Sequence, residues 1–203
     1  MKEWVSAKVI DNKRWTDGLH SLRFEAPVEN FVAGQFTQVA VDIEGERVGR
    51  PYSLVNSPQE RPLEIYFNTV PEGPLSNHLA RIQPGEQLWV TPKASGILTL
   101  RDIPDVESLW LLATGTALGP FLSILKTEEP WQRFRRILLV HAVRYARELN
   151  YADTVQGFRQ LYPEQFRFLP IVSREHFAEA MSGRIPDRLL DGSLERRLGQ
   201  YRH

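Results

Sequence analysis

The hydrophobic pattern of this chain changes near residue 102, and that change limits the folds open to it. Before this point, six short apolar stretches are separated mostly by Gly, Pro, Asn or Asp, at residues 5–9, 19–24, 36–41, 51–55, 63–70 and 87–91. Six short strands at this spacing favour a small antiparallel barrel. Beyond it, continuous apolar stretches alternate with helical segments, which is typical of a parallel sheet.

We therefore predict a β plus α/β chain of two domains. Residues 1–101 would form an antiparallel six-stranded β-barrel, and residues 102–203 a parallel-sheet α/β domain. In the second part we expect strands at 108–113, 137–143 and 166–172, and helices at 121–126 and 151–162. The Asp-Ile-Pro-Asp segment at 102–105 is the expected boundary.

Composition removes several classes of function. The 203 residues include no Cys, which excludes disulfides, Cys-ligated iron–sulfur clusters and a Cys nucleophile. The five His show no HExxH spacing and there is no GxSxG turn, so the sequence gives little support to a hydrolase function. We also expect no metal site. No apolar run reaches ~18 residues and no signal-peptide pattern is present. We expect a cytoplasmic monomer that binds neither membrane nor nucleic acid.

The most informative single stretch is Arg-Pro-Tyr-Ser at residues 50–53, followed by two apolar residues. In an extended chain Arg50 and Tyr52 share one face and Ser53 points to the other. Pro51 has no N–H, so the strand should be interrupted or lie at an edge there. A ligand with a diphosphate and an aromatic ring would use all three side chains. An ordinary strand with surface Arg and Tyr explains the same spacing.

Two glycine-containing turns precede predicted helices. Ser76 lies at the start of a helix expected over 75–81, where free amides and the helix dipole suit a phosphate. Ser76 serving only as a helix cap is the alternative. After the 108–113 strand, Gly115 permits a tight turn and Gly119 lets a ligand or strand approach closely. Glycine turns of this kind are weak evidence for a dinucleotide on their own.

Arginine is concentrated in the last third of the chain. Residues 133–203 hold 13 Arg, no Lys and eight acids. Arg144 and Arg174 each follow a predicted strand, and Arg184 lies in a Ser-Gly-Arg-Ile-Pro segment. Loops at the carboxyl ends of parallel strands bind ligands, and three such Arg suit a 2′-phosphate. His141 lies inside a strand and is expected to be a hydrogen-bonded core residue.

The Arg-Pro-Tyr-Ser string, the Gly-Pro-Leu-Ser turn at 73–76 and the Ala-Thr-Gly-Thr-Ala-Leu-Gly-Pro string at 113–120 resemble motifs of the ferredoxin–NADP reductase family, in its bacterial branch. The resemblance implies FAD and NADP(H) as cofactors. It implies that Arg50 and the Leu75–Ser76 amides hold the FAD diphosphate, although Pro74 stands where Lys is expected. The other roles implied are Tyr52, Ser53, Tyr66 and Thr116 beside the flavin, and Thr114, Gly115, Arg144, Ser173, Arg174 and Arg184 for NADP.

The resemblance also implies a mechanism. FAD would exchange single electrons with an acidic ferredoxin or flavodoxin and a hydride with the nicotinamide at N5, with Ser53 and Tyr52 as the catalytic side chains and no general base. Two alternatives stay open: an NADH-dependent reductase of an oxygenase system, and a non-catalytic FAD-binding module. Family members continue for some tens of residues beyond this sequence, so we expect an incomplete second domain with one edge of the 108–113 strand uncovered.

Overall fold

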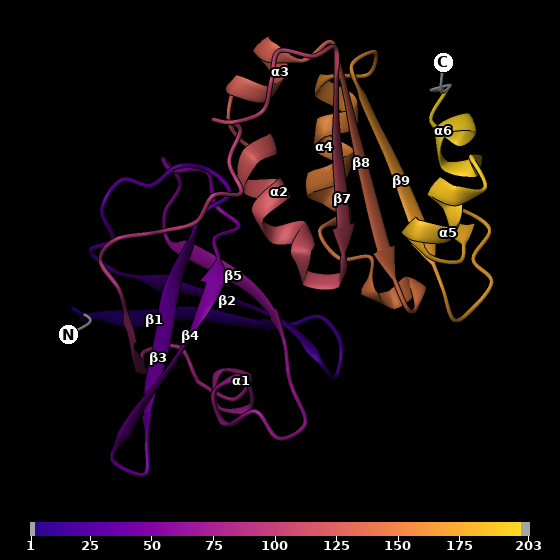
Figure 1. Ribbon diagram of the computed structural model, residues 1–203. Helices are drawn as coiled ribbons and strands as arrows, with labels where there is room; N and C mark the ends of the chain where they lie inside the picture. The colour runs from indigo at the N-terminus through magenta and orange to yellow at the C-terminus, as the bar shows by residue number, and fades with distance from the viewer. Residues whose placement is uncertain (1–2, 200–203) are drawn as a thin grey trace. The chain divides into compact units, whose positions relative to one another are not determined.

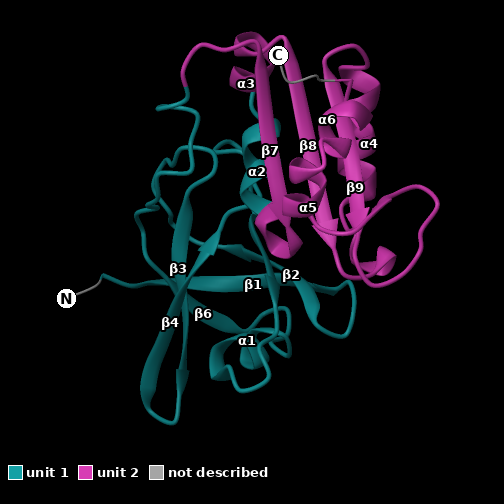
Figure 2. Ribbon diagram, turned by 45° about the vertical axis from the view of Figure 1, so that its right-hand side comes forward, with its two compact units in different colours: residues 1–103, 119–127 teal, residues 104–118, 128–203 magenta. Residues whose placement is uncertain are grey.

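The computed structural model describes residues 3–199 and divides into two compact units (Figures 1 and 2). The first unit comprises residues 1–103 together with 119–127, and the second comprises 104–118 and 128–203. The predicted pairing of an all-β part with an α/β part is confirmed. No helix within residues 3–199 is both long and apolar enough to span a membrane.

The first unit is built on six antiparallel strands. Their order across the sheet is β4-β3-β6-β1-β2-β5, and an isolated bridge between Leu54 and Ile65 links the chain just after one edge strand to the other edge strand. The expected strands are all present, with longer first and fourth members. The bounds are β1 Val5–Arg14, β2 Leu19–Glu25, β3 Phe36–Ile43, β4 Glu46–Ser53, β5 Leu63–Asn68 and β6 Gln87–Val90.

Alternate side chains fill the core of this unit. Leu22 and Phe24 on β2, and Leu63, Ile65 and Phe67 on β5, are buried in one hydrophobic cluster. This is the period of two expected for half-buried strands. Strand β4 starts earlier than the predicted 51–55 segment because it forms a hairpin with β3, closed by a Glu-Gly turn at 44–45 with positive φ. Pro51 lies on this edge strand, as predicted.

Two helices pack within the first unit. Helix α1 (Pro74–Leu79) contacts β3 and β4. Helix α2 (Leu118–Leu125) follows a strand of the other unit in sequence, but residues 119–127 have their contacts here. A Cβ at Gly119 would lie 3.4 Å from Val55 Cγ2, so the absent side chain lets the helix approach the barrel closely, as expected.

The second unit is a four-stranded parallel sheet in the order β10-β9-β8-β7 (Figure 1). Its strands are β7 Ser108–Thr114, β8 Arg136–Val143, β9 Phe166–Val172 and the short β10 Met181–Ser182. Strand β7 pairs only with β8 among the described residues, which leaves its other edge uncovered, as expected. Its helices are α3 Glu129–Arg133, α4 Ala152–Leu161, α5 Ile185–Leu190 and α6 Ser193–Arg197.

Helices cover both faces of this sheet. On one face Ile185 of α5 and Leu194 of α6 pack with Leu169 and Ile171 of β9. On the other, Phe158 of α4 meets Phe166 edge-on, with ring centroids 5.9 Å apart. Strand β10 and helices α3, α5 and α6 were not predicted, because stretches of two to six residues are too short to display a hydrophobic period.

Candidate functional site

The predicted Arg-Pro-Tyr-Ser motif ends strand β4. Arg50 is exposed and its Nη1 donates a hydrogen bond to the Gly49 carbonyl at 2.8 Å. Its guanidinium makes no ion pair with any residue in the described range 3–199. Tyr52 and Ser53 are half-buried, and Leu54 beyond them is fully buried. The motif therefore runs from solvent into the barrel, with its polar groups at the accessible end.

The ring of Tyr52 is fixed by aromatic packing. It meets Phe67 edge-on, with centroids 5.9 Å apart and an interplanar angle of 77°. Phe67 in turn stacks on His20 at 5.6 Å. Burial raises the pKa of the Tyr52 phenol, partly offset by the positive charge of Arg50. The hydroxyl is therefore protonated at neutral pH, and the ring presents a rigid flat surface.

Tyr66 is buried and lies on β5 next to Phe67, so the two rings point to opposite faces of the strand. A Cβ at Gly119 would lie 3.9 Å from Tyr66 Cβ, which puts the start of helix α2 against Tyr66. The structure thus brings Tyr66 together with α2 and leaves Tyr52 on the core side with Phe67.

The start of helix α1 has the form expected of an anion site. Its N-cap is Gly73, without a side-chain cap, so the interpretation of Ser76 as the cap is wrong. The Ser76 hydroxyl instead accepts from the Val70 N–H at 3.0 Å and donates to the Gly73 carbonyl at 3.3 Å. The N–H groups of Leu75 and Ser76 have no acceptor among the described residues, as is usual in a first helical turn.

These groups fit a flavin dinucleotide by their chemistry. Helix α1 packs against the strand that carries Arg50, so a cation and two free amides come from neighbouring elements. A diphosphate is bound well by a cation together with backbone amide donors. The half-buried ring of Tyr52 and the hydroxyl of Ser53 follow on the same strand and suit an aromatic ring system.

In the second unit, the turn after β7 is a 3₁₀ segment, Gly115–Ala117. Gly115 has φ +53°, the left-handed conformation that its tight turn requires. Thr114 is exposed and Thr116 half-buried. His141 of β8 is buried, and its Nε2 lies 3.0 Å from the Gly115 carbonyl oxygen. The predicted hydrogen-bonded core histidine is confirmed, and burial lowers its pKa to about 4.

The three predicted arginine loops meet at the carboxyl ends of β8 and β9. The Arg174 N–H donates to the Arg144 carbonyl at 2.9 Å, and Ser173 Oγ donates to Val143 O at 3.2 Å. The Gly183 N–H bonds to Val172 O at 3.1 Å, which ties the segment before Arg184 to the end of β9. All three arginines are exposed, and none of their guanidinium groups is paired within residues 3–199.

Two carboxylates hold these loops in place. Glu148 accepts from the Arg144 N–H at 2.8 Å and the Tyr145 N–H at 3.2 Å. Glu175 accepts from the Ala146 N–H at 2.5 Å, joining the loop after β9 to the loop after β8. Because these acids bond backbone amides, they fix the loops without neutralising the guanidinium groups.

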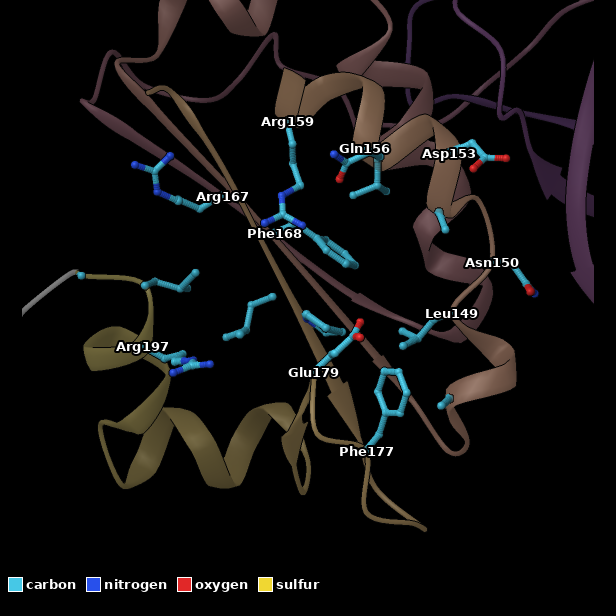
Figure 3. A pocket seen from close by; sticks show the side chains of 17 residues that line it. Leu149, Asn150, Asp153, Gln156, Arg159, Arg167, Phe168, Phe177, Glu179 and Arg197 are labelled. Carbon is cyan, nitrogen blue, oxygen red and sulfur yellow. The ribbon is translucent and has the colours of Figure 1, made fainter. Parts of the chain in front are cut away.

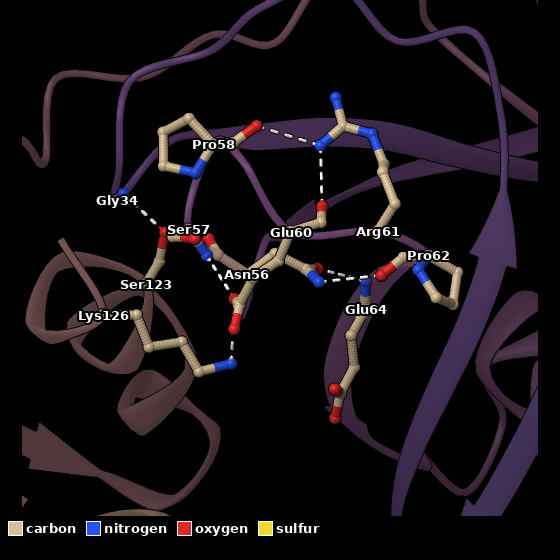
Figure 4. A network of polar contacts seen from close by, with 10 residues as sticks. All are labelled: Gly34, Asn56, Ser57, Pro58, Glu60, Arg61, Pro62, Glu64, Ser123 and Lys126. Carbon is tan, nitrogen blue, oxygen red and sulfur yellow. Dashed lines mark hydrogen bonds and ion pairs between the residues drawn. The ribbon is translucent and has the colours of Figure 1, made fainter.

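A buried polar network around Asn56 was not foreseen from the sequence (Figure 4). Ser123 of α2 donates to the Asn56 carbonyl at 2.5 Å and accepts from the Gly34 N–H at 3.3 Å. The Asn56 side chain donates to Pro62 O at 2.8 Å and accepts from the Glu64 N–H. The available signal was the single Ser in the apolar run 121–125.

A cavity of about 1020 Å³ lies in the second unit, beside β9 and between α4 and the end of α6 (Figure 3). Arg159, Arg167 and Phe168 are among its lining residues. None of the predicted NADP residues lines it. Ala146 of the loop with Arg144, and Phe177 and Glu179 of the loop with Arg174, do line it, so the cavity adjoins these two loops.

Comparisons with known protein families match the two parts of the chain separately. A family model described as an oxidoreductase FAD-binding domain matches residues 6–94. A second, described as an oxidoreductase NAD-binding domain, matches residues 111–201. Together the two models span most of the chain and fall on the two halves that carry the two sets of predicted residues.

The chain is also similar to named reductases. It is 47% identical over 199 residues to the flavodoxin/ferredoxin–NADP reductase of Shigella flexneri, covering 98% of this chain and 80% of that protein. Identity to the Escherichia coli K12 protein of the same name is 46% over the same coverage. The crystal structure of a Neisseria gonorrhoeae ferredoxin NADP⁺ reductase with bound FAD and NADP has a TM-score of 0.92 at 29% identity, covering 100% of this chain and 82% of that one.

Proposed function

Because this chain belongs to the flavodoxin/ferredoxin–NADP reductase family, we propose that it is an FAD-dependent oxidoreductase carrying electrons between NADPH and ferredoxin or flavodoxin. The observation that carries this is the similarity to curated reductases over 98% of the chain. The partner would be an acidic electron-transfer protein, and the enzyme a cytoplasmic monomer. Residues 1–101 would bind FAD and residues 102–203 NADP(H), with α2 contributing to the first unit.

Three elements of the first unit, strands β4 and β5 and helix α1, would hold FAD. Bound FAD would supply the redox chemistry, taking a hydride from NADPH and releasing electrons one at a time. Arg50 and the free amides of Leu75 and Ser76 would neutralise the diphosphate. Tyr52 would pack on the isoalloxazine, and the Ser53 hydroxyl would donate near N5 and align it. Tyr66 and Thr116 would complete the surroundings of the ring.

The second unit would bind NADP(H) along one edge of its sheet. Thr114 and Gly115 would lie under the diphosphate. Arg144, Ser173, Arg174 and Arg184 would hold the adenosine end through its 2′-phosphate. The support for this is the meeting of three loops whose guanidinium groups are exposed and have no partner in the described part of the chain.

An NADH-dependent reductase of an oxygenase system is the nearest alternative. The chain has a TM-score of 0.81 and 26% identity to a cytochrome P450 reductase from Amycolatopsis, covering 94% of this chain and 58% of that one. NADH carries a hydroxyl where NADPH carries the 2′-phosphate. The arginine loops therefore favour NADPH.

An anaerobic titration followed by absorbance tests the proposal. Yellow protein should bleach on addition of NADPH at far lower concentration than NADH, and should then reduce added flavodoxin or ferredoxin. Bleaching by NADH in preference would support the oxygenase-type reductase. Yellow protein that responds to neither nucleotide would contradict the reductase and leave a non-catalytic flavin-binding module.

A further inference from the structure

The bond from His141 to the Gly115 turn has a defined polarity. A carbonyl oxygen only accepts, so Nε2 of His141 must carry the proton. His141 is 1% exposed, and its lowered pKa keeps the ring neutral at physiological pH. The His141 ring, held in the sheet, therefore keeps its Nε2–H donor directed at one backbone carbonyl of the turn.

Fixing that carbonyl also fixes the next amide. In a trans peptide the C=O and N–H groups point in opposite directions. Since the Gly115 carbonyl points toward His141, the Thr116 N–H of the same peptide unit points away from the buried ring. That N–H has no acceptor in the described part of the chain, whereas the Gly115 oxygen also accepts the Leu118 N–H.

Hydrogen bonds set the orientation of the peptide between Gly115 and Thr116. The Leu118 N–H binds the carbonyl from within the turn, and His141 Nε2 binds it from strand β8. The His141 bond is the tertiary contact to this carbonyl from outside the turn.

We propose that His141 is a positioning residue for the nucleotide: its Nε2–H holds the Gly115 carbonyl inward so that the Thr116 N–H is presented outward to the diphosphate. This rests on the proposed function, which places the NADP diphosphate at the turn. His141 bonds the Gly115 turn, whereas the Arg144 loop that follows the same strand is held by Glu148, so we expect His141 to act on the diphosphate and not on the 2′-phosphate.

The two ends of the ligand can be probed separately. NADP⁺ carries both the diphosphate and the 2′-phosphate, whereas adenosine 2′-monophosphate carries only the latter. Dissociation constants for both would be measured by calorimetry on the flavin-loaded protein. His141→Leu removes the donor, and His141→Asn has an amide too short to reach Gly115. His141→Gln places an amide N–H close to the position of Nε2.

Losing one neutral hydrogen bond predicts a roughly threefold to tenfold weaker NADP⁺ affinity in the Leu and Asn variants. Binding of adenosine 2′-monophosphate should stay within about twofold, and the Gln variant should recover most of the NADP⁺ affinity. Arg174→Ala is the matched control, because it should weaken both ligands.

Two results would overturn the inference: equal weakening of both ligands by the Leu and Asn variants, or no weakening of either. The Asn and Gln variants keep the test valid if the Leu variant does not fold. Wild-type protein that binds neither ligand would instead contradict the proposed NADP site itself.

Discussion

At the scale of single residues, Arg50 stands where a diphosphate is expected and has no ion-pair partner within residues 3–199. Arg50 is exposed and bonded only to a neighbouring carbonyl in the described structure. Arg47, three residues earlier on the same strand, is bonded through both Nε and Nη2 to Asp42 and stacks over Trp89. The two arginines share a strand, but within the described residues Arg47 is paired with an acid and Arg50 is not.

Arg50→Ala should therefore weaken FAD binding, while Arg47→Ala should not. A charge-assisted hydrogen bond contributes about 1.5–3 kcal/mol, which corresponds to a roughly tenfold to hundredfold loss of affinity. Flavin content after purification and the FAD dissociation constant of the reconstituted apoprotein would be measured. If Arg50→Ala protein retains full flavin with unchanged affinity, the diphosphate anchor is misassigned.

The second residue-scale prediction concerns nucleotide choice. Arg174→Ala should lower the NADPH/NADH preference in kcat/KM by roughly tenfold or more, because NADH has no 2′-phosphate to lose contact with. Arg135→Ala is the control, since Arg135 is exposed, pairs with Glu107 at 3.6 Å and precedes β8 instead of following it. Unchanged ratios in Arg144→Ala, Arg174→Ala and Arg184→Ala would favour the NADH-type reductase.

At the scale of elements, helix α2 is fastened to the barrel by polar contacts as well as apolar packing. Ser123 is fully buried and bonds both the Asn56 carbonyl and the Gly34 amide. Asn56 lies three residues after Ser53, and Gly34 precedes β3. These two hydrogen bonds hold helix α2 against the loops at Asn56 and Gly34 of the first unit.

Ser123→Ala should destabilise the protein by about 1–3 kcal/mol, because a buried amide and a buried carbonyl each lose a partner. Lys126→Ala on the same helix breaks only the 3.3 Å ion pair with the partly exposed Glu60, for which about 1 kcal/mol or less is expected. Urea denaturation of both variants would be compared with wild type. A smaller loss for Ser123→Ala than for Lys126→Ala would argue against the buried network as a determinant of stability.

At the scale of the whole molecule, the buried neutral His141 makes stability depend on pH. Its folded pKa is about 4, below the usual histidine value of 6.5, so the unfolded chain binds more protons between these values. Stability should therefore fall as the pH drops from about 6.5 toward 4, and this contribution should not change further below that. A difference of about 2.5 pKa units corresponds to ~3 kcal/mol.

Comparing wild type with His141→Gln isolates this contribution, because Gln does not titrate. Urea midpoints would be measured from pH 7 to pH 4.5, and the wild type should lose more stability than the variant over that range. Other groups that titrate, such as the buried His20 with its lowered pKa, are common to both proteins. Parallel losses in the two proteins would contradict the assignment of His141 as a buried neutral group.

Local patterns were enough to predict the regular elements and the short motifs. The six barrel strands and the three long parallel strands follow from hydrophobic periods of two and from continuous apolar runs. Pro51 on an edge strand and Gly115 at positive φ follow from what those residues permit. Each of these depends on neighbours within a few positions, which the sequence displays directly.

The tertiary structure decided what depends on residues far apart in the chain. Ser123 and Asn56 are 67 positions apart, and His141 and Gly115 are 26 apart. The short helices α5 and α6 owe their place to packing on β9, since five or six residues do not form a stable helix alone. Sequence patterns give each segment's preference, whereas hydrogen bonds between distant segments depend on geometry that exists only once the sheets have formed.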